Sequence, residues 1–245
     1  MSKPLRLAMW SGPRNISTAL MRSFGARPDA QVCDEPLYAY YLRETGLLHP
    51  VRDTILREHE NDWRKVVAEL SGPLQAGKNI YYQKHMAHHL LPEMDRAWLD
   101  GFESAFLIRE PRAMLASLIE KLDAPVLEDT GLPQQVALFE AQRERTGRTP
   151  IVIDSKDLLL DPAGMLTQLC ERVGLEFDPR MLAWEPGVHP TDGCWAEYWY
   201  GNALASTGFA PYRERQVQLP ASYEELARTC EQLYAQLHPQ RLTSA

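Results

Sequence analysis

The stretch MWSGPRNISTAL, residues 9–20, decides how this chain folds. An apolar strand, residues 5–10, leads into it, and Gly12 and Pro13 predict a tight turn. Apolar side chains then recur at three- and four-residue spacing until Gly25, which can end a helix. A strand, a tight loop and a helix in this order place the loop at a helix N-terminus, which is an arrangement for binding an anion.

This loop offers several groups that donate hydrogen bonds. Backbone N–H groups at a helix N-terminus have no intrahelical partner, and the helix dipole adds positive potential there. No Gly-Lys-Ser/Thr sequence closes the loop, so it lacks the Walker A pattern of nucleoside triphosphate enzymes. We expect a phosphate-sized anion here, bound by backbone groups, the Arg14 guanidinium and two hydroxyls. The candidate ligands are Gly12, Pro13, Arg14, Asn15, Ile16, Ser17 and Thr18.

Composition favours a single α/β domain that spans residues 1–245. The chain has 245 residues, of which 44% are hydrophobic, enough for a continuous core. Its formal charge of −7 argues against a nucleic-acid or anionic-membrane partner. Four scattered cysteines and an N-terminus without a signal-like apolar region favour a cytoplasmic location, and no run is apolar enough to span a bilayer.

Strand-like and helix-like segments alternate along the chain. The strand-like segments are 5–10, 30–33, 80–83, 105–108 and 150–153. Helical spacing of apolar residues predicts further helices at 90–99, 113–122, 136–143 and 165–173. This alternation is typical of an open, mostly parallel sheet flanked by helices, whose ligands bind beyond the carboxyl ends of the strands.

Two parts of the chain lie outside this alternation. Residues 43–78 are rich in charge and predict a helical insertion, either a lid or mere surface. Residues 194–245 predict a C-terminal lid and a final helix that begins with a capping box at Ser222 and Glu225. An aromatic cluster in this part either belongs to the core or walls a ligand pocket, and it consists of Trp195, Tyr198, Trp199 and Tyr200.

A second candidate anion site follows the fourth predicted strand. Arg109 ends that strand, Pro111 suits the first turn of a helix, and Ser117 lies almost two turns inside it. A bidentate guanidinium and a hydroxyl could hold an anion from two sides. The alternative is that Arg109 pairs with a nearby acid and Ser117 is a small packing residue.

Together these motifs resemble the sulfotransferases that use 3′-phosphoadenosine 5′-phosphosulfate (PAPS). Residues 13–18 are similar to the family's 5′-phosphosulfate loop, and Arg109 with Ser117 is similar to its 3′-phosphate motif. Residues 153–162 look like a further family segment, a strand followed by an Asp-Pro turn. The loop, taken with Asp34-Glu35-Pro36, resembles a bacterial sulfotransferase-like branch.

The resemblance implies a three-layer α/β sandwich like that of the P-loop NTPases, and transfer of a sulfuryl group from PAPS to a hydroxyl or amine of a small acceptor. The product would be adenosine 3′,5′-bisphosphate, and no metal is expected. Arg14 and Lys84 are candidates for stabilising the leaving phosphate oxygen, and Lys84 as a surface charge is the alternative. Thr207 and Gly208 lie where the family closes a loop over the cofactor.

Several choices stay open at this point. Glu35 and His85 both stand at strand ends and are both candidates for the base that removes the acceptor's proton. His85, with His88 and His89, could instead belong to a zinc site. Ile16 replaces the glycine common in the family, so the loop either avoids a positive φ there or lies farther from the anion.

A phosphotransferase of the P-loop class and a non-catalytic nucleotide-binding module are the two alternative functions. A kinase would require a metal and would not need a 3′-phosphate site, whereas a module would bind without transfer. A homodimer is the assembly to be tested.

Overall fold

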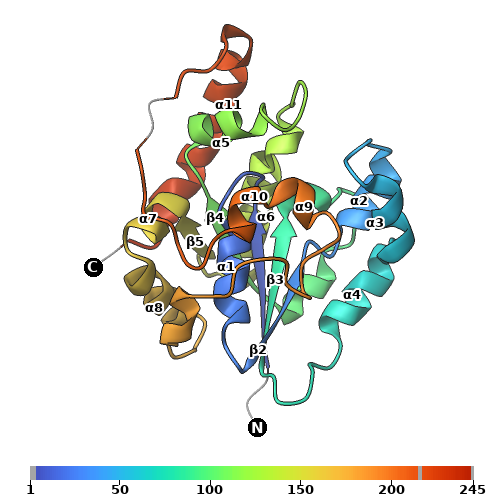
Figure 1. Cartoon of the computed structure of the whole chain (residues 1–245), viewed down its shortest axis with the longest axis vertical. Helices are drawn as coiled ribbons and strands as arrows, with labels where there is room; N and C mark the ends of the chain where they lie inside the picture. The colour runs from blue at the N-terminus through green and yellow to red at the C-terminus, as the bar shows by residue number, and fades with distance from the viewer. Residues whose placement is uncertain (1–3, 215–216, 244–245) are drawn as a thin grey trace.

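A five-stranded sheet forms the centre of the molecule (Figure 1), in the order β2-β3-β1-β4-β5 with every neighbouring pair parallel. The computed structural model describes residues 4–214 and 217–243, and the rest of the predicted domain 1–245 lies outside these. The predicted parallel α/β fold is confirmed, and each predicted strand overlaps an observed one. The strands are β1 (Leu5–Ser11), β2 (Ala30–Asp34), β3 (Ile80–Met86), β4 (Glu103–Ile108) and β5 (Ile151–Asp154).

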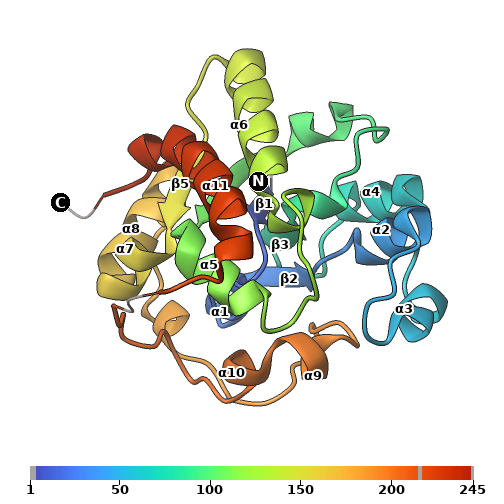
Figure 2. The same cartoon turned by 90° about the horizontal axis from the view of Figure 1, so that it is seen from above.

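Helices cover both faces of the sheet (Figure 2). α1 (Ser17–Gly25) and α8 (Pro162–Arg172) pack on one face, and α4 (Trp63–Ser71) and α6 (Leu132–Thr146) pack on the other. The remaining α-helices are α2 (Tyr38–Thr45), α3 (Arg52–Glu58), α5 (Pro111–Leu118), α7 (Ser155–Leu160), α9 (Ala196–Trp199), α10 (Gly201–Leu204) and α11 (Glu224–Leu237). Short 3₁₀ turns are η1 (Ala87–His89), η2 (Ala97–Gly101), η3 (Glu128–Thr130), η4 (Pro179–Leu182), η5 (Ala221–Tyr223) and η6 (His238–Gln240).

Strand pleating decides what surrounds the residues at the end of β3. Successive side chains of a strand point to opposite faces of the sheet. Tyr82 stacks on Phe24 of α1 with ring centroids 4.5 Å apart, whereas Tyr81 belongs to the core cluster on the opposite face. By this alternation Lys84 shares the α1 face with Tyr82, and His85 lies on the opposite face.

Residues 90–99 do not form the predicted α-helix. Pro92 lacks a backbone N–H and its ring crowds the preceding turn, so the segment makes turns that lead into η2. The guanidinium of Arg96 donates to the carbonyls of Leu90 and Leu91 at 3.4 and 3.2 Å, which satisfies groups that a helix would have paired. The apolar residues of the segment are still buried in the core against α4 and α6.

The predicted capping box at Ser222 and Glu225 is also wrong. α11 begins at Glu224 after Tyr223, and no side chain caps it. Ser222 lies inside the 3₁₀ turn η5, where its backbone is not in the extended conformation that an N-cap residue needs.

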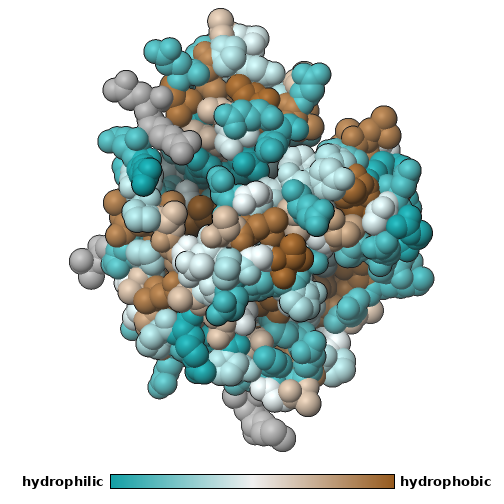
Figure 3. Space-filling view, viewed as in Figure 1, coloured by the Kyte–Doolittle hydropathy of each residue, from teal (hydrophilic) through white to brown (hydrophobic). Residues whose placement is uncertain are grey.

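The surface in Figure 3 is mostly hydrophilic, with a hydrophobic tip over α2. The loop between α2 and α3 carries this tip, and Leu48 in it is 89% exposed. Within residues 4–214 and 217–243, no helix combines the length and the apolar character that crossing a membrane requires.

Candidate active site

The loop between β1 and α1 places its backbone strain at Arg14. Arg14 has a φ of 54°, whereas Ile16 has a φ of −90°, so the β-branched residue avoids the left-handed conformation. Asn15 braces the loop, because its Nδ2 donates to the Leu107 carbonyl at 3.0 Å and its Oδ1 accepts the Ile16 N–H at 2.9 Å. A left-handed non-glycine residue costs about 1–3 kcal/mol and is typical of functional sites.

A second segment of the chain, which carries Thr130 and Gln135, packs against this loop. A Cβ atom on Gly12 would lie 2.3 Å from the Thr130 carbonyl oxygen, so only glycine allows this approach. The Nε2 of Gln135 donates to the carbonyls of Trp10 and Leu107 at 3.0 Å each, which ties β1 to β4. Sequence reasoning missed Thr130 and Gln135, because nothing in their local pattern marks a contact with a distant loop.

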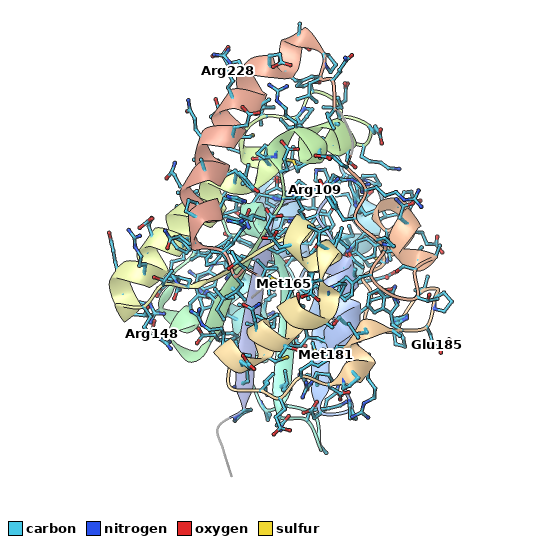
Figure 4. All side chains as sticks on the ribbon, turned by 90° about the vertical axis from the view of Figure 1, so that its left-hand side faces the viewer. Arg109, Arg148, Met165, Met181, Glu185 and Arg228 are labelled. Carbon is cyan, nitrogen blue, oxygen red and sulfur yellow. The ribbon has the colours of Figure 1, made fainter. Side chains whose placement is uncertain are left out.

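The predicted anion ligands from three elements meet beside this loop. The Nε of Arg14 donates to Ser117 Oγ at 2.9 Å, and its Nη1 donates to the Trp199 carbonyl at 3.2 Å. The guanidinium of Arg109 donates to the backbone carbonyl of Arg14. Figure 4 shows Arg109 toward the middle of the molecule, unlike Arg148 at the edge. The 5′ and 3′ motifs are therefore neighbours in space, and Arg14 spans from one to the other.

A cavity of about 1130 Å³ joins these residues to the ends of β2 and β3. Three predicted site residues are not part of its lining among the described residues: Gly12, His85 and Thr207. Gly208 lines the cavity, and its backbone forms an isolated β-bridge with Ala183. The predicted site residues that line it are Pro13, Arg14, Asn15, Ile16, Ser17, Thr18, Glu35, Lys84, Arg109, Ser117 and Gly208.

Lys84 lies in a buried charged cluster at the ends of β2 and β3. Its side chain is 1% exposed, and Nζ donates to Asp34 Oδ1 at 2.8 Å, Glu35 Oε1 at 2.6 Å and the Tyr200 hydroxyl at 2.6 Å. An ammonium has three N–H donors, and these bonds use all of them. The arrangement gives Lys84 the task of holding carboxylates and leaves it no hydrogen for a leaving phosphate.

Sequence reasoning did not assign Asp34 or Tyr200 to this cluster. The Tyr200 hydroxyl lies 2.7 Å from both Asp34 carboxylate oxygens and accepts the indole N–H of Trp195 at 3.1 Å. Asp34 Oδ2 also accepts the Gly193 N–H at 3.2 Å. Of the aromatic residues near the C-terminus, Trp195 and Tyr200 are buried, Trp199 lines the cavity and Tyr198 is exposed.

The pKa values of Glu35 and Lys84 are both raised in this cluster, but for different reasons. Burial raises the pKa of Glu35, and the nearby Lys84 ammonium opposes this only in part. Burial lowers the pKa of Lys84, but the carboxylates of Asp34 and Glu35 outweigh it and raise that pKa overall. Two carboxylates share one cation, so Glu35 is a carboxylate with increased proton affinity, which suits a general base. Its φ of 43° directly before Pro36 marks a second strained position in the site.

His85 lies on the opposite face of the sheet from Lys84. Its ring stacks on Trp10 with centroids 4.3 Å apart, and its Nε2 is 3.2 Å from Gln83 Oε1. Burial lowers the pKa of His85 to about 3, so the imidazole is neutral at physiological pH. Glu35 lines the cavity and His85 does not, so Glu35 is the better placed of the two candidate bases.

The other histidines of this run pack against aromatic rings. His89 stacks on Tyr38 and Tyr41 with centroids 4.7 Å from each, and His88 meets Tyr41 edge-on at 5.3 Å. The Nδ1 of His49 is 2.8 Å from the Tyr38 hydroxyl. In the described part of the chain, no group of three or more His, Cys, Asp or Glu side chains is arranged to hold a metal ion.

Comparisons with known proteins agree with this geometry. Residues 5–238 match the family model described as Sulfotransferase domain. Branched-chain-amino-acid aminotransferase-like proteins 2 and 1 of Arabidopsis thaliana are 36% identical over 227 residues and 35% identical over 237. These alignments cover 92% and 96% of this chain but 40% and 42% of those proteins, so the chain spans about two-fifths of their length.

Solved structures share the fold at low sequence identity. The sulfotransferase domain of the Synechococcus PCC 7002 olefin synthase has a TM-score of 0.58 at 18% identity, over 96% of both chains. The sulfotransferase from Alicyclobacillus acidocaldarius has a TM-score of 0.56 at 14% identity, over 98% of this chain and 96% of that one. With the match over residues 5–238, these findings place the chain in the sulfotransferase domain family.

Proposed function

We propose that this chain transfers a sulfuryl group from PAPS to a hydroxyl or amine of a small acceptor. The observation that carries the proposal is one cavity that joins the anion-binding groups around Arg14 to the buried carboxylate of Glu35. Transfer needs these two components within reach of each other, because the donor must be held while the acceptor loses a proton.

The residues of the cavity fit a donor with two anionic groups. The N-terminus of α1, with the hydroxyls of Ser17 and Thr18, would hold the phosphosulfate end, and Arg109 with Ser117 would hold the 3′-phosphate. When bound, PAPS supplies an activated sulfuryl group, whose sulfur–oxygen bond to phosphate breaks as the acceptor atom bonds to sulfur. Arg14 would stabilise the negative charge on that phosphate oxygen, because its guanidinium reaches from the loop to Ser117 of the second motif.

Glu35 would act as the base that takes the acceptor's proton. Among the described residues, Lys84 donates to Oε1 and the Tyr200 hydroxyl lies 3.1 Å from the same atom, which leaves Oε2 for an acceptor in the cavity. Lys84 would keep that carboxylate in place. We assign Lys84 this positioning role in preference to contact with the leaving oxygen, since its three donors are engaged. Residues 194–210, which carry Trp199 and Gly208 to the cavity, would form its lid.

Ligand-induced thermal stabilisation tests the proposal. Adenosine 3′,5′-bisphosphate should raise the melting temperature far more than ATP or adenosine 5′-monophosphate, because it fills both anion sites. A ligand at ~100-fold its Kd stabilises the folded state by about 2.7 kcal/mol. Arg109→Ala should abolish the preference for the 3′-phosphate, whereas Arg148→Ala, a matched arginine with a 73% exposed side chain, should preserve it. Equal stabilisation by ATP, or a shift that EDTA removes, would replace the proposal with a metal-dependent phosphotransferase.

A further inference from the structure

One part of the cavity lining consists of aromatic rings. Tyr38, Tyr41, His49, His88, His89 and Trp199 line it. Their rings contact one another: His49 lies 6.2 Å from Tyr41 and 6.0 Å from Trp199 between centroids, and His89 stacks on Tyr38 at 4.7 Å. We refer to this set of six residues as the aromatic end of the cavity.

Two carboxylates bring negative charge to the aromatic end. Asp129 lines the cavity and acts on two of its rings, because its charge opposes the effect of burial on His49 and adds to the effect of burial that raises the pKa of Tyr41 to about 12. Glu35 adjoins Tyr38, whose N–H donates to the Glu35 carbonyl at 3.0 Å, and the charge of Lys84 there compensates one of two carboxylates. The histidines add no positive charge, since burial lowers the pKa of His88 to about 3.

Three of the arginines that line the cavity have hydrogen-bond partners among the described side chains. Arg14 bonds to Ser117, Arg112 to Glu224 and Glu231, and Arg241 to Asp157. None of these contacts neutralises Asp129. An anionic acceptor would be repelled by the Asp129 carboxylate, whereas a cation would gain from that carboxylate and from the ring faces.

Two buried nitrogen atoms at the aromatic end also lack a hydrogen-bond partner among the described residues. They are the Nδ1 atoms of His88 and His89. His89 is 2% exposed and lines the cavity. A buried polar atom without a partner costs free energy, and a ligand that bonds to it removes that cost. The aromatic end thus has the features of a binding site for a polar, positively charged group.

We propose that the acceptor is a small cation, an ammonium compound with a hydroxyl or amine nucleophile, which places its charge beside Asp129 and its nucleophile toward Glu35. The inference rests on the proposed function and names its substrate class. Tyr41 and Trp199 supply ring faces for the cation, and Asp129 supplies the counter-charge.

Pairs of probes that differ only in charge test this. Choline and 3,3-dimethylbutan-1-ol have the same shape and hydroxyl, as do 3-aminopropan-1-ol and butan-1-ol to a close approximation. Ligand-observed NMR on the full chain, with and without adenosine 3′,5′-bisphosphate, should show the cation of at least one pair binding about tenfold tighter than its neutral partner. No preference in either pair, or tighter binding of 3,3-dimethylbutanoate, would overturn the proposal.

Two variants locate the site. Asp129→Asn keeps an oxygen that can accept the Val126 N–H and should remove the preference for the cation. Glu128→Gln removes the same charge from a neighbouring exposed side chain outside the cavity lining and should leave the preference intact. If Asp129→Asn folds but keeps the preference, Asp129 does not recognise the cation and the proposal fails. If the unmodified chain does not bind adenosine 3′,5′-bisphosphate but still prefers the cation, the sulfotransferase proposal is refuted and the cation site is retained.

Discussion

Lys84 and His85 are neighbours on β3, but the two faces of the sheet give them opposite chemistry. On the α1 face, Lys84 is buried with two carboxylates and a hydroxyl and remains charged. On the other face, His85 is buried against Trp10 and loses its charge, because no carboxylate accompanies it.

Burial alone therefore does not decide the charge of a group at a strand end. Both side chains are 1% exposed, and the difference comes from the partners that each face supplies. The Lys84 face opens into the cavity, whereas the His85 face is core. Four substitutions test this contrast between the two faces.

Glu35→Gln should have the largest effect on transfer. Loss of a general base lowers the rate by ~10²–10⁴-fold, while binding of adenosine 3′,5′-bisphosphate and folding should stay nearly intact. In the unmodified chain the rate should rise with pH as Glu35 loses its proton, and its raised pKa should shift that rise above the ordinary glutamate range. Steady-state kinetics against pH measures both. A near-normal rate in Glu35→Gln with a collapsed rate in His85→Asn would move the role to His85.

Lys84→Met should have the second largest effect, on stability. Removing the cation leaves the buried carboxylates of Asp34 and Glu35 facing each other, and breaking such a pair costs about 3–5 kcal/mol of unfolding free energy. Urea unfolding measures the loss. Adding Asp34→Asn to the same chain should recover part of it, because one of the uncompensated charges disappears. A Lys84→Met variant as stable as the parent would show that solvent already compensates the cluster.

Tyr200→Phe should have a smaller effect on the same face. It removes the hydroxyl that joins Asp34, Lys84 and Trp195, and leaving such buried partners unsatisfied costs about 1–3 kcal/mol. In the proposed mechanism Tyr200 helps to hold Glu35, so kcat should fall while the KM for the donor stays constant. Tyr198→Phe, at a 51% exposed tyrosine of the same segment, is the matched control.

His85→Phe should change transfer least, because its face is closed to the cavity. Its effect should appear in acid instead. The folded-state pKa of about 3 lies below the ordinary value near 6.5, so the unfolded chain binds an extra proton as pH falls, and stability is lost over that window. Replacing His85 should make the unfolding free energy less dependent on pH between 6.5 and 5, by up to about 1.4 kcal/mol per pH unit. An unchanged slope would mean that His85 titrates normally in the folded protein.

Local patterns were sufficient to predict much of this molecule. The five strands and the loop at Arg14 follow from apolar runs and turn residues that are adjacent in sequence, and the family resemblance drew on the same segments. The helix predicted at 90–99 failed although Pro92 was in view, because the apolar spacing there serves a buried turn.

The interior of the site depended on tertiary contacts that no local pattern encodes. Tyr200 lies 166 positions from Asp34 in sequence, and its hydroxyl accepts one of the three hydrogen bonds that Lys84 donates. The face occupied by His85 required the register of β3, which the sequence pattern did not resolve. Asp129 lies in the short turn η3, which carries no sequence motif, so its place beside the aromatic end became visible only in three dimensions.

The contact between Gly12 and Thr130 means that the loop between β1 and α1 does not keep its shape on its own. Its shape depends on the Thr130 carbonyl beneath it and on Gln135, whose amide reaches Trp10 across 125 positions of sequence. Grafting residues 9–20 onto another parallel sheet would transfer the predicted anion ligands without the Thr130 and Gln135 contacts that hold the loop in shape. A working transplant would have to include residues 127–135 as well, and swapping either segment between homologues should succeed only when both are exchanged together.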